Sequence, residues 1–380
     1  MPTPPSPIAF IDLKAQQARI RGRVEARFAA VLDHGAYING PEVKELEQAL
    51  CDFTGVPRAL AVANGTDALV MAMMAMDLKR SDAVFIPAFT YNATASAVIL
   101  AGATPVFVDV RAGDFNLDPG DLEQRIAEVR QGGRLDPRLV LTVDLFGIPA
   151  NYEAIFAVAE REGLKVLADA AQSFGATWNG RWAGNIAPVT ATSFFPSKAL
   201  ACYGDGGALF FRDPELWEVC EQIRWHGTDA ARRESVRVGF NGRLDSLQCA
   251  VVVEKLVIFP DELERRREIA ALYDRRLANH VDAQHFVAGA TSGYGLYTVA
   301  IDNRDAVQAA LKADGVPTAV YYSQPLHRMK AFQPYAAGPM PQSERLAARV
   351  LSLPMHPYLT ETQADYVADR LIAAVEDARV

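Results

Sequence analysis

The stretch that decides the fold is "RALAVANGTDALVMAMMAM", residues 58–76. Its first part, 58–63, is an apolar run typical of a strand, and 65–76, rich in alanine and methionine, predicts a buried helix. Asn64 stands between them, where a helix N-cap is expected. A strand, a short polar turn and a helix form the repeating unit of α/β proteins, so the flanking sequence should repeat this pattern.

The pattern does repeat along the chain. Further continuous apolar runs predict strands at 83–89, 104–110, 139–147 and 164–171, and helical periodicity predicts helices at 92–102 and 151–163. Continuous rather than alternating apolar runs suit the strands of a parallel sheet that is covered on both faces. We therefore predict an α/β fold, with a mostly parallel sheet in a large domain that spans residues 10–258.

The character of the sequence changes at Phe259-Pro260. A long, charged, amphipathic segment predicts a helix at 261–280. The following segments predict a strand at 294–302, a helix at 304–315, a strand at 317–322 and a last helix at 360–378, where Thr360 and Gln363 have the spacing of a capping box. These elements predict a smaller α+β domain at 259–380.

The composition excludes several classes of protein. Half of the 380 residues are apolar and the net charge is −8, which argues against a nucleic-acid-binding surface. No apolar stretch approaches the roughly 20 residues of a membrane helix, and "MPTPPSPIAF" (1–10) lacks the regions of a signal peptide. The four cysteines form no C-x-x-C pair and the histidines have no metal-ligand spacing. We expect a reduced, cytoplasmic protein without a metal site.

Polar residues follow the predicted strands, where ligands bind in open parallel sheets. They are Gly65 and Thr66, Thr90 and Tyr91, Asp169 and Gln172, and Ser193, Ser197 and Lys198. Each group has a simpler interpretation: a helix cap before Gly65, a buried capping acid at Asp169, core packing of Tyr91 and a surface lysine at Lys198.

Together these residues fit the needs of pyridoxal phosphate (PLP). This cofactor needs a lysine for a Schiff base and a carboxylate that keeps its ring nitrogen protonated. It also needs backbone amides and hydroxyls at its phosphate, a flat side chain on its ring and a polar group at its phenolic oxygen. These roles are filled, in turn, by Lys198, by Asp169, by Gly65 and Thr66 with Ser193, by Tyr91, and by Gln172.

Four motifs make the sequence similar to a known family. "DAAQSFGA" (169–176), "SFFPSK" (193–198), "GDGGA" (204–208) and "GFNGRLDSLQCA" (239–250) resemble the DegT/DnrJ nucleotide-sugar aminotransferases, and the likeness runs from 10–17 to 351–359. The resemblance implies a fold-type-I, aspartate-aminotransferase-like architecture, L-glutamate as amino donor, and a homodimer whose active sites lie at the interface. It implies the same roles for the residues above, and it implies that Asn241 reaches the phosphate of the other subunit.

Some relatives that carry histidine in place of the lysine are dehydratases, so the presence of Lys198 favours transamination.

Within this family, "LDHGAYINGPEV" (32–43) resembles enzymes that aminate C3 of a UDP-linked 3-keto-N-acetylglucosaminuronic acid for surface polysaccharides such as lipopolysaccharide O-antigen. Arg243 would then meet the uronate carboxylate, or else form an interface salt bridge. The other substrate-binding residues that this resemblance implies are Gly35, Tyr37, Ser197, Tyr321 and Tyr322.

Relatives often read His-Tyr-Pro where this chain has Tyr321-Tyr322-Ser323. The departure leaves the contacts to the sugar undetermined. A dTDP- or GDP-linked 3- or 4-keto deoxysugar therefore remains as an alternative substrate.

Two other classes of function remain as alternatives. A dinucleotide-binding oxidoreductase would need G-x-G-x-x-G after its first strand, but the nearest match, "GDGGAL" (204–209), ends in leucine and comes late in the chain. A non-catalytic regulator could share the PLP fold, although Lys198 and Asp169 argue against it.

Overall fold

A seven-stranded sheet forms the centre of the computed structural model, which describes residues 7–378. Residues 1–6 lie outside the described part, and so does most of the stretch 1–10 on which the prediction about a signal peptide rests. The strand order is β1-β9-β8-β5-β4-β2-β3. The bounds are β1 Arg58–Val62, β2 Asp82–Pro87, β3 Thr104–Val108, β4 Asp136–Val143, β5 Lys165–Asp169, β8 Val189–Ser193 and β9 Gly207–Phe211. Only β9 runs antiparallel to its neighbours among these strands, which confirms the predicted mostly parallel sheet.

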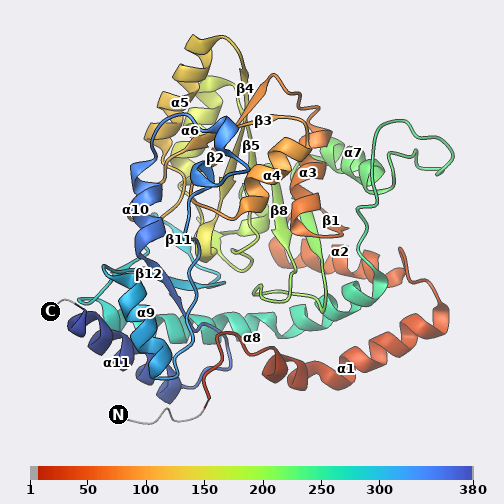
Figure 1. The fold of residues 1–380 in the computed structure, drawn as a ribbon. Coiled ribbons are helices and arrows are strands. Elements are labelled where there is room, and N and C mark those ends of the chain that lie inside the picture. Colours follow the sequence, from red (N-terminus) through yellow and green to blue (C-terminus); the bar gives the residue numbers. More distant parts are fainter. Residues whose placement is uncertain (1–6, 379–380) are drawn as a thin grey trace.

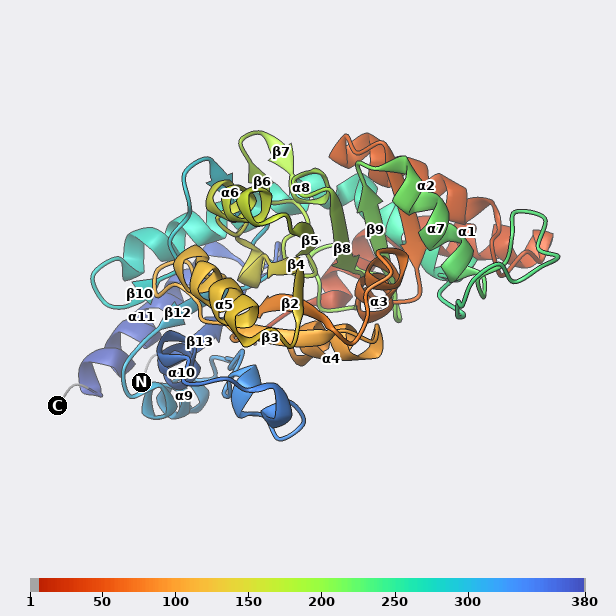
Figure 2. The same ribbon diagram turned by 90° about the horizontal axis from the view of Figure 1, so that it is seen from above.

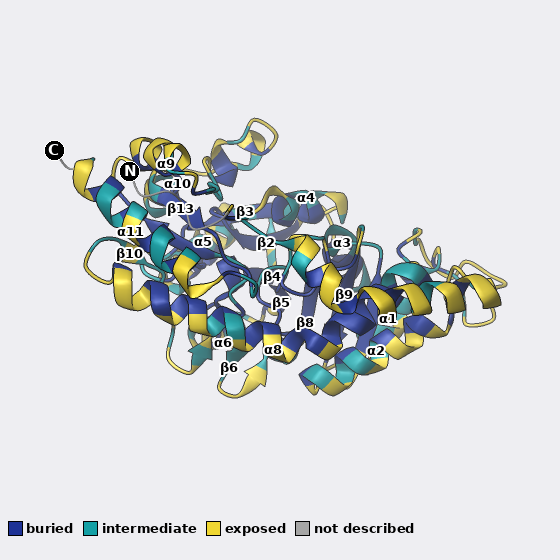
Figure 3. Ribbon diagram, turned by 90° about the horizontal axis from the view of Figure 1, so that it is seen from below, coloured by how far each residue is buried: buried dark blue, intermediate teal, exposed yellow. Residues whose placement is uncertain are grey.

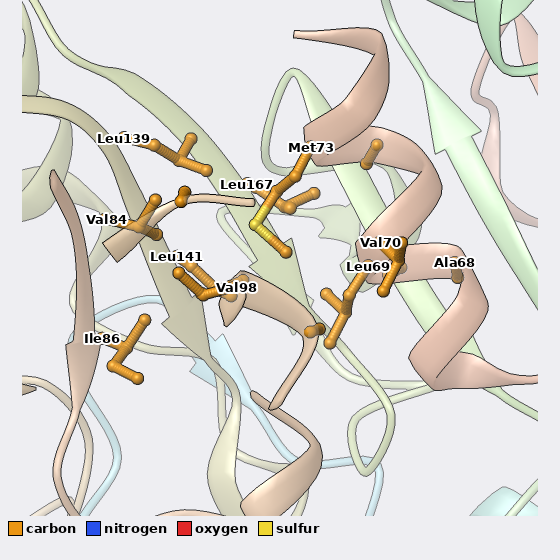
Figure 4. Packing of buried hydrophobic residues seen from close by; sticks show 14 of the residues in the cluster. Ala68, Leu69, Val70, Met73, Val84, Ile86, Val98, Leu139, Leu141 and Leu167 are labelled. Atoms are coloured by element: carbon orange, nitrogen blue, oxygen red, sulfur yellow. The ribbon is translucent and has the colours of Figure 1, made fainter. Parts of the chain in front are cut away.

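Helices cover both faces of this sheet (Figure 2). One face packs against α3 (Gly65–Ala75), α4 (Asn92–Leu100) and α7 (Pro214–Arg224), and the other against α2 (Pro41–Thr54), α5 (Pro119–Gly132), α6 (Tyr152–Glu162) and α8 (Ser246–Leu277). Neighbouring strand residues serve opposite faces: Val84 and Leu139 pack with Met73 of α3 (Figure 4), whereas Phe85 packs with α5 and α6. Two buried faces explain why the strands are apolar at consecutive positions.

The C-terminal part has a core of its own. A three-stranded antiparallel sheet, β10 (Asp282–Ala283), β12 (Tyr297–Ala300) and β13 (Val350–Leu353), packs with α9 (Arg304–Ala313) and α11 (Glu361–Asp377), while α10 (Pro341–Arg349) leads into β13. The predicted capping box is present, since Thr360 and Gln363 bond each other's backbone amides. A second small sheet joins β6 (Thr177–Trp178), β7 (Arg181–Trp182) and β11 (Ala290–Thr291).

Two of the predicted elements differ in the structure. The helix expected at 261–280 is the second half of α8, which begins at Ser246 and continues through Pro260. The strand expected at 317–322 is wrong, because only Ala319 forms an isolated bridge, with Ser352, and the residues beyond it turn away from the sheet. The proposed division into residues 10–258 and 259–380 therefore falls inside one continuous helix, and it stays a prediction.

Helix α8 connects the two cores (Figure 1). It packs against α2 and α1 (Leu13–His34) near the central sheet and against α11 near the C-terminal sheet. Its inner residues are buried, and α1 keeps an exposed outer face (Figure 3). No helix within residues 7–378 is long and apolar enough to cross a membrane.

Candidate active site

A cavity of about 490 Å³ lies where the parallel strands end. The structure brings most of the sequence-predicted site residues together here: Gly65, Thr66, Tyr91, Asp169, Gln172, Ser193, Ser197, Lys198, Tyr321 and Tyr322 all line it. They come from segments far apart in the chain that meet because β1, β2, β5 and β8 point the same way.

An amine and a carboxylate share the interior of this cavity. Asp169 is the last residue of β5, and its oxygens accept hydrogen bonds from the Ala171 amide (3.1 Å) and the Thr94 hydroxyl (3.2 Å). Burial raises the pKa of Asp169, and the nearby Lys198 ammonium opposes this rise. Burial likewise lowers the pKa of Lys198, which Asp169 opposes. Lys198 is thus an amine in a desolvated site and not an open surface lysine.

The N-terminus of α3 forms a cradle for an anion. The side chain of Asn64 caps the helix by accepting a hydrogen bond from the Asp67 amide (2.8 Å), as the simpler interpretation of this turn predicts. Within the described residues, no acceptor is found for the amides of Gly65 and Thr66. A Cβ at Gly65 would lie 2.9 Å from Cβ of Ser193, so only glycine lets the helix begin this close to β8. Free amides at a helix start bind phosphate.

Aromatic and amide side chains also line the cavity. The rings of Tyr91 and Tyr322 lie 5.9 Å apart between centroids, and Tyr91 is 55 % exposed, so it is not core packing. The Gln172 side chain donates from Nε2 to the Tyr322 hydroxyl (3.0 Å) and accepts at Oε1 from the Phe146 amide (2.7 Å). These two bonds fix which end of the amide faces the cavity.

Four predicted residues lie outside the cavity lining of their own chain. Gly35 ends α1, and Tyr37 follows it, exposed on the surface. Asn241 is exposed, and Arg243 stacks its guanidinium 4.5 Å from the centre of the Trp225 ring. Arg243 Nε is buried without a hydrogen-bond partner, and Arg243 forms no ion pair with any of residues 7–378. Asn241 and Arg243 both follow a segment between α7 and α8 that extends away from the body of the molecule (Figures 1 and 2).

The sequence analysis missed two residues that support the site. Thr94 lies in the first turn of α4 and holds Asp169, and Asp144 follows β4 as directly as the other site residues follow their strands. The strand predicted at 139–147 contains Asp144, whereas β4 ends at Val143. Had the predicted strand ended before this charged residue, the rule of polar residues at strand ends would have found Asp144.

Asp144 is fully buried and hydrogen-bonded on both oxygens. Oδ1 accepts from the Ala150 amide (3.0 Å) and the Tyr152 hydroxyl (2.9 Å), and Oδ2 accepts from the Ser173 hydroxyl (2.9 Å). Burial raises the pKa of Asp144 to about 6, although these hydrogen bonds act in the opposite direction. The free-energy cost of burying the charged carboxylate therefore exceeds the stabilisation that these hydrogen bonds give to it.

Replacing Asp144 with asparagine is expected to stabilise the protein at neutral pH. A folded-state pKa of about 6 lies above the unfolded value of roughly 4, so the contribution of Asp144 to stability is fully present below pH 4 and is lost as the pH rises through 6. The asparagine does not titrate. Its advantage over the wild type should reach up to about 3 kcal/mol at pH 7 and vanish near pH 4.

Thermal unfolding of both proteins at the two pH values measures this difference. Asp52→Asn, the same change at an exposed carboxylate on α2, is the control for replacing a carboxylate with an amide outside the buried site. An Asp144→Asn advantage that is equal at both pH values, or absent at both, would contradict the expectation.

Comparison with known proteins identifies the family. Residues 18–372 match the model of the DegT/DnrJ/EryC1/StrS aminotransferase family. The chain is 47 % identical, over 93 % of its length and 96 % of the relative's, to the UDP-2-acetamido-2-deoxy-3-oxo-D-glucuronate aminotransferase of Pseudomonas aeruginosa.

Solved structures agree with this match. A DegT DnrJ EryC1 StrS aminotransferase from Brucella abortus has a TM-score of 0.94 and 45 % identity, with 96 % of this chain and 98 % of that chain covered. DesV of S. venezuelae, solved in complex with a ketimine intermediate, has a TM-score of 0.92 and 35 % identity, with 97 % and 99 % covered. The likeness confirms the aminotransferase fold and excludes the dinucleotide-binding alternative. The chain belongs to the DegT/DnrJ/EryC1/StrS family of PLP-dependent nucleotide-sugar aminotransferases.

Proposed function

We propose that this aminotransferase moves an amino group from L-glutamate to C3 of a UDP-linked 3-keto-N-acetylglucosaminuronic acid, a step in making surface polysaccharide such as O-antigen. The observation that carries the choice of sugar is the 47 % identity, over nearly the whole chain, to an enzyme named for that substrate. The cavity supplies the means for the transfer, since it holds a desolvated amine, a carboxylate and an anion cradle together.

The residues of the cavity fit PLP. The unpaired amides of Gly65 and Thr66, with the Ser193 side chain beside them, would hold its phosphate. The Asp169 carboxylate would keep the ring nitrogen protonated by accepting a hydrogen bond from it, and the exposed face of Tyr91 would cover the ring. The amide Nε2 of Gln172, which already donates to a hydroxyl, would donate to the phenolic oxygen.

When bound, PLP takes up the electron pair left on the reacting carbon and carries the amino group between donor and acceptor. The chain's own contribution is to bind, orient and move protons. Lys198 would hold the cofactor's carbonyl carbon in the resting enzyme and, once released, move the proton from Cα of the donor. Its lowered pKa suits this work, because more of the amine is then neutral near physiological pH. Asp169 would partner the protonated ring nitrogen and balance its charge.

Two residues would act on the neighbouring subunit of a homodimer. Asn241 and Arg243 lie outside their own cavity, on the chain that returns from the extended segment to the end of β1, where Arg243 pairs with Val62. A partner related by twofold symmetry would receive Asn241 at its phosphate cradle and Arg243 at the sugar carboxylate. The absence of an ion pair to Arg243 within residues 7–378 supports this role, since its charge is left for a carboxylate from outside the chain.

The visible absorbance of the purified protein, before and after L-glutamate, tests cofactor and donor together. A yellow band that bleaches with glutamate supports the proposal, and a band that glutamate leaves unchanged refutes glutamate as donor. A panel of keto sugars then tests the acceptor. Turnover of a dTDP- or GDP-linked deoxysugar in preference to the uronate would refute the proposed sugar, and bound PLP without any turnover would favour a regulator.

Arg243→Ala is expected to weaken the uronate substrate selectively. Loss of a charge-assisted hydrogen bond costs about 1.5–3 kcal/mol, so KM for the uronate should rise roughly 10- to 150-fold. KM for a keto sugar without a carboxylate should change little. The matched control is Arg232→Ala, because Arg232 stacks on the same Trp225 ring but pairs with Glu221. Equal loss for both sugars would mean that Arg243 serves the interface and not the carboxylate.

A further inference from the structure

A strained residue next to the cavity holds the Gln172 side chain. Phe146, in the short turn Leu145–Gly147 after β4, is fully buried with φ +62° and ψ 6°, a left-handed conformation that a bulky residue rarely adopts. In this conformation its amide donates to Gln172 Oε1 at 2.7 Å. Strain of this kind persists only where the surroundings hold the backbone in place, so the question is what holds Phe146.

Asp144 holds this turn from both sides. Its Oδ1 accepts from the Ala150 amide and the Tyr152 hydroxyl, which closes the loop from 144 to 152 around Phe146. Its Oδ2 accepts from the hydroxyl of Ser173, the neighbour of Gln172 in the next strand's loop. The backbone amide of Asp144 also donates to the carbonyl of Asp169 (3.0 Å). One carboxylate therefore fastens the loop after β4 to the turn after β5.

The orientation of the Gln172 amide follows from this arrangement. A backbone N–H can pair only with the oxygen of that amide, so Phe146 fixes Oε1 and turns Nε2 toward Tyr322 and the cavity. Nε2 is a donor, and a donor at this point suits an anionic or phenolic oxygen. Were Phe146 to relax, the amide could rotate and present its oxygen there instead.

We propose that Asp144 is a positioning residue that clamps the loop 144–152 to the turn 170–173, so that Phe146 keeps the Gln172 amide N–H directed into the cavity. The proposal rests on the role proposed above for Gln172 at the phenolic oxygen of PLP. It needs the shape of Asp144 and not its charge. An asparagine at 144 could accept from the Ala150 amide and the Tyr152 hydroxyl with its oxygen, and could donate to the Ser173 hydroxyl with its nitrogen.

A double-mutant cycle on the PLP-loaded protein tests the proposal. Asp144→Ala and Gln172→Ala should each lower kcat/KM about 10- to 100-fold, the usual cost of misplacing a group at a reacting centre. The double variant should be no worse than Gln172→Ala, because Asp144 acts through Gln172. Both single variants should shift the visible absorbance band of bound PLP in the same direction, and Asp144→Asn should keep the wild-type band and most of the activity.

The control is another buried, multiply bonded carboxylate, Asp109. It accepts hydrogen bonds from the amide and the hydroxyl of Ser343, and its carboxylate bonds neither the loop 144–152 nor the turn 170–173. Asp109→Ala should lower the melting temperature without shifting the band. Losses that multiply in the double variant, or an unshifted band in Asp144→Ala, would overturn the proposal. If Asp144→Ala does not fold, Tyr152→Phe can replace it, because this change removes the hydrogen bond from the Tyr152 hydroxyl to Asp144. An unchanged absorbance band in Tyr152→Phe would also overturn the proposal.

The absorbance comparison separates this proposal from the proposed function. It needs only PLP and no sugar, so failure to turn over the uronate would refute the substrate and leave the result for Asp144 standing. An unshifted band in Gln172→Ala would refute the role of Gln172, and the proposal for Asp144 with it.

Discussion

Replacing Lys198 with alanine is expected to abolish turnover, with kcat reduced at least about 10,000-fold, because the change removes the residue that we propose as both the covalent anchor of the cofactor and the proton carrier. The fold should survive, since Lys198 lines a cavity on a turn after β8 and is not part of a packed core. Steady-state assays give the rate. Borohydride reduction of the PLP-loaded protein should add the cofactor's mass to the peptide that contains Lys198, and should add none in the variant.

The control for this change is Lys165→Ala. Lys165 begins β5 and is exposed at the amino end of the strand that Asp169 completes, so it carries the same charge on the same sheet but far from the cavity. It should keep wild-type activity. A Lys198→Ala protein with normal activity would refute the assignment of Lys198, and so would cofactor mass found on another lysine.

Asp169→Asn is expected to lower kcat about 100- to 1,000-fold while PLP still binds, because it removes the preorganised charge that we propose as the partner of the ring nitrogen. The amide is nearly the same size as the carboxylate. Its oxygen can still accept from the Ala171 amide, and its nitrogen can meet the Thr94 hydroxyl. The loss should therefore appear in kcat and in the absorbance spectrum, with little change in the melting temperature.

Two further variants test whether the loss comes from the charge of Asp169. Asp169→Glu keeps the charge but moves it, and should recover part of the activity that asparagine loses. Asp82→Asn changes a buried carboxylate at the opposite end of the sheet, where it caps the Lys79 amide, and should leave kcat unchanged. An Asp169→Asn enzyme with wild-type kcat would show that the ring nitrogen needs no charged partner here.

Much of the large domain follows from the sequence, because its strands are buried on both faces and therefore read as uninterrupted apolar runs. Ala83 and Val84 serve opposite faces, and both are apolar. The parallel direction of these strands then places their ends together, so the order of strands and polar residues is enough to predict that Asp169 and Ser193 share one site. Their proposed roles rest on the chemistry of PLP and on the family resemblance.

The rest depends on contacts that no local pattern encodes. The run at 317–322 has the β-branched and aromatic composition of a strand, yet Tyr321 and Tyr322 pack against cavity residues and not in a sheet. Pro260 suggested a boundary, but a helix tolerates the loss of one hydrogen bond when its flanks are packed as well as those of α8. The conformation of Phe146 depends on Asp144, and each of the two residues also bonds a residue of another loop, Gln172 or Ser173.

The continuity of α8 has a mechanical consequence. At 32 residues it is a rod about 48 Å long, with one end embedded in each core. A swing of the C-terminal core about residue 259 would break several backbone hydrogen bonds in a buried stretch of this rod. We therefore expect the two cores to keep their spacing throughout the catalytic cycle. Substrate access must then depend on short segments at the cavity mouth, such as those that carry Ile11 and Tyr321.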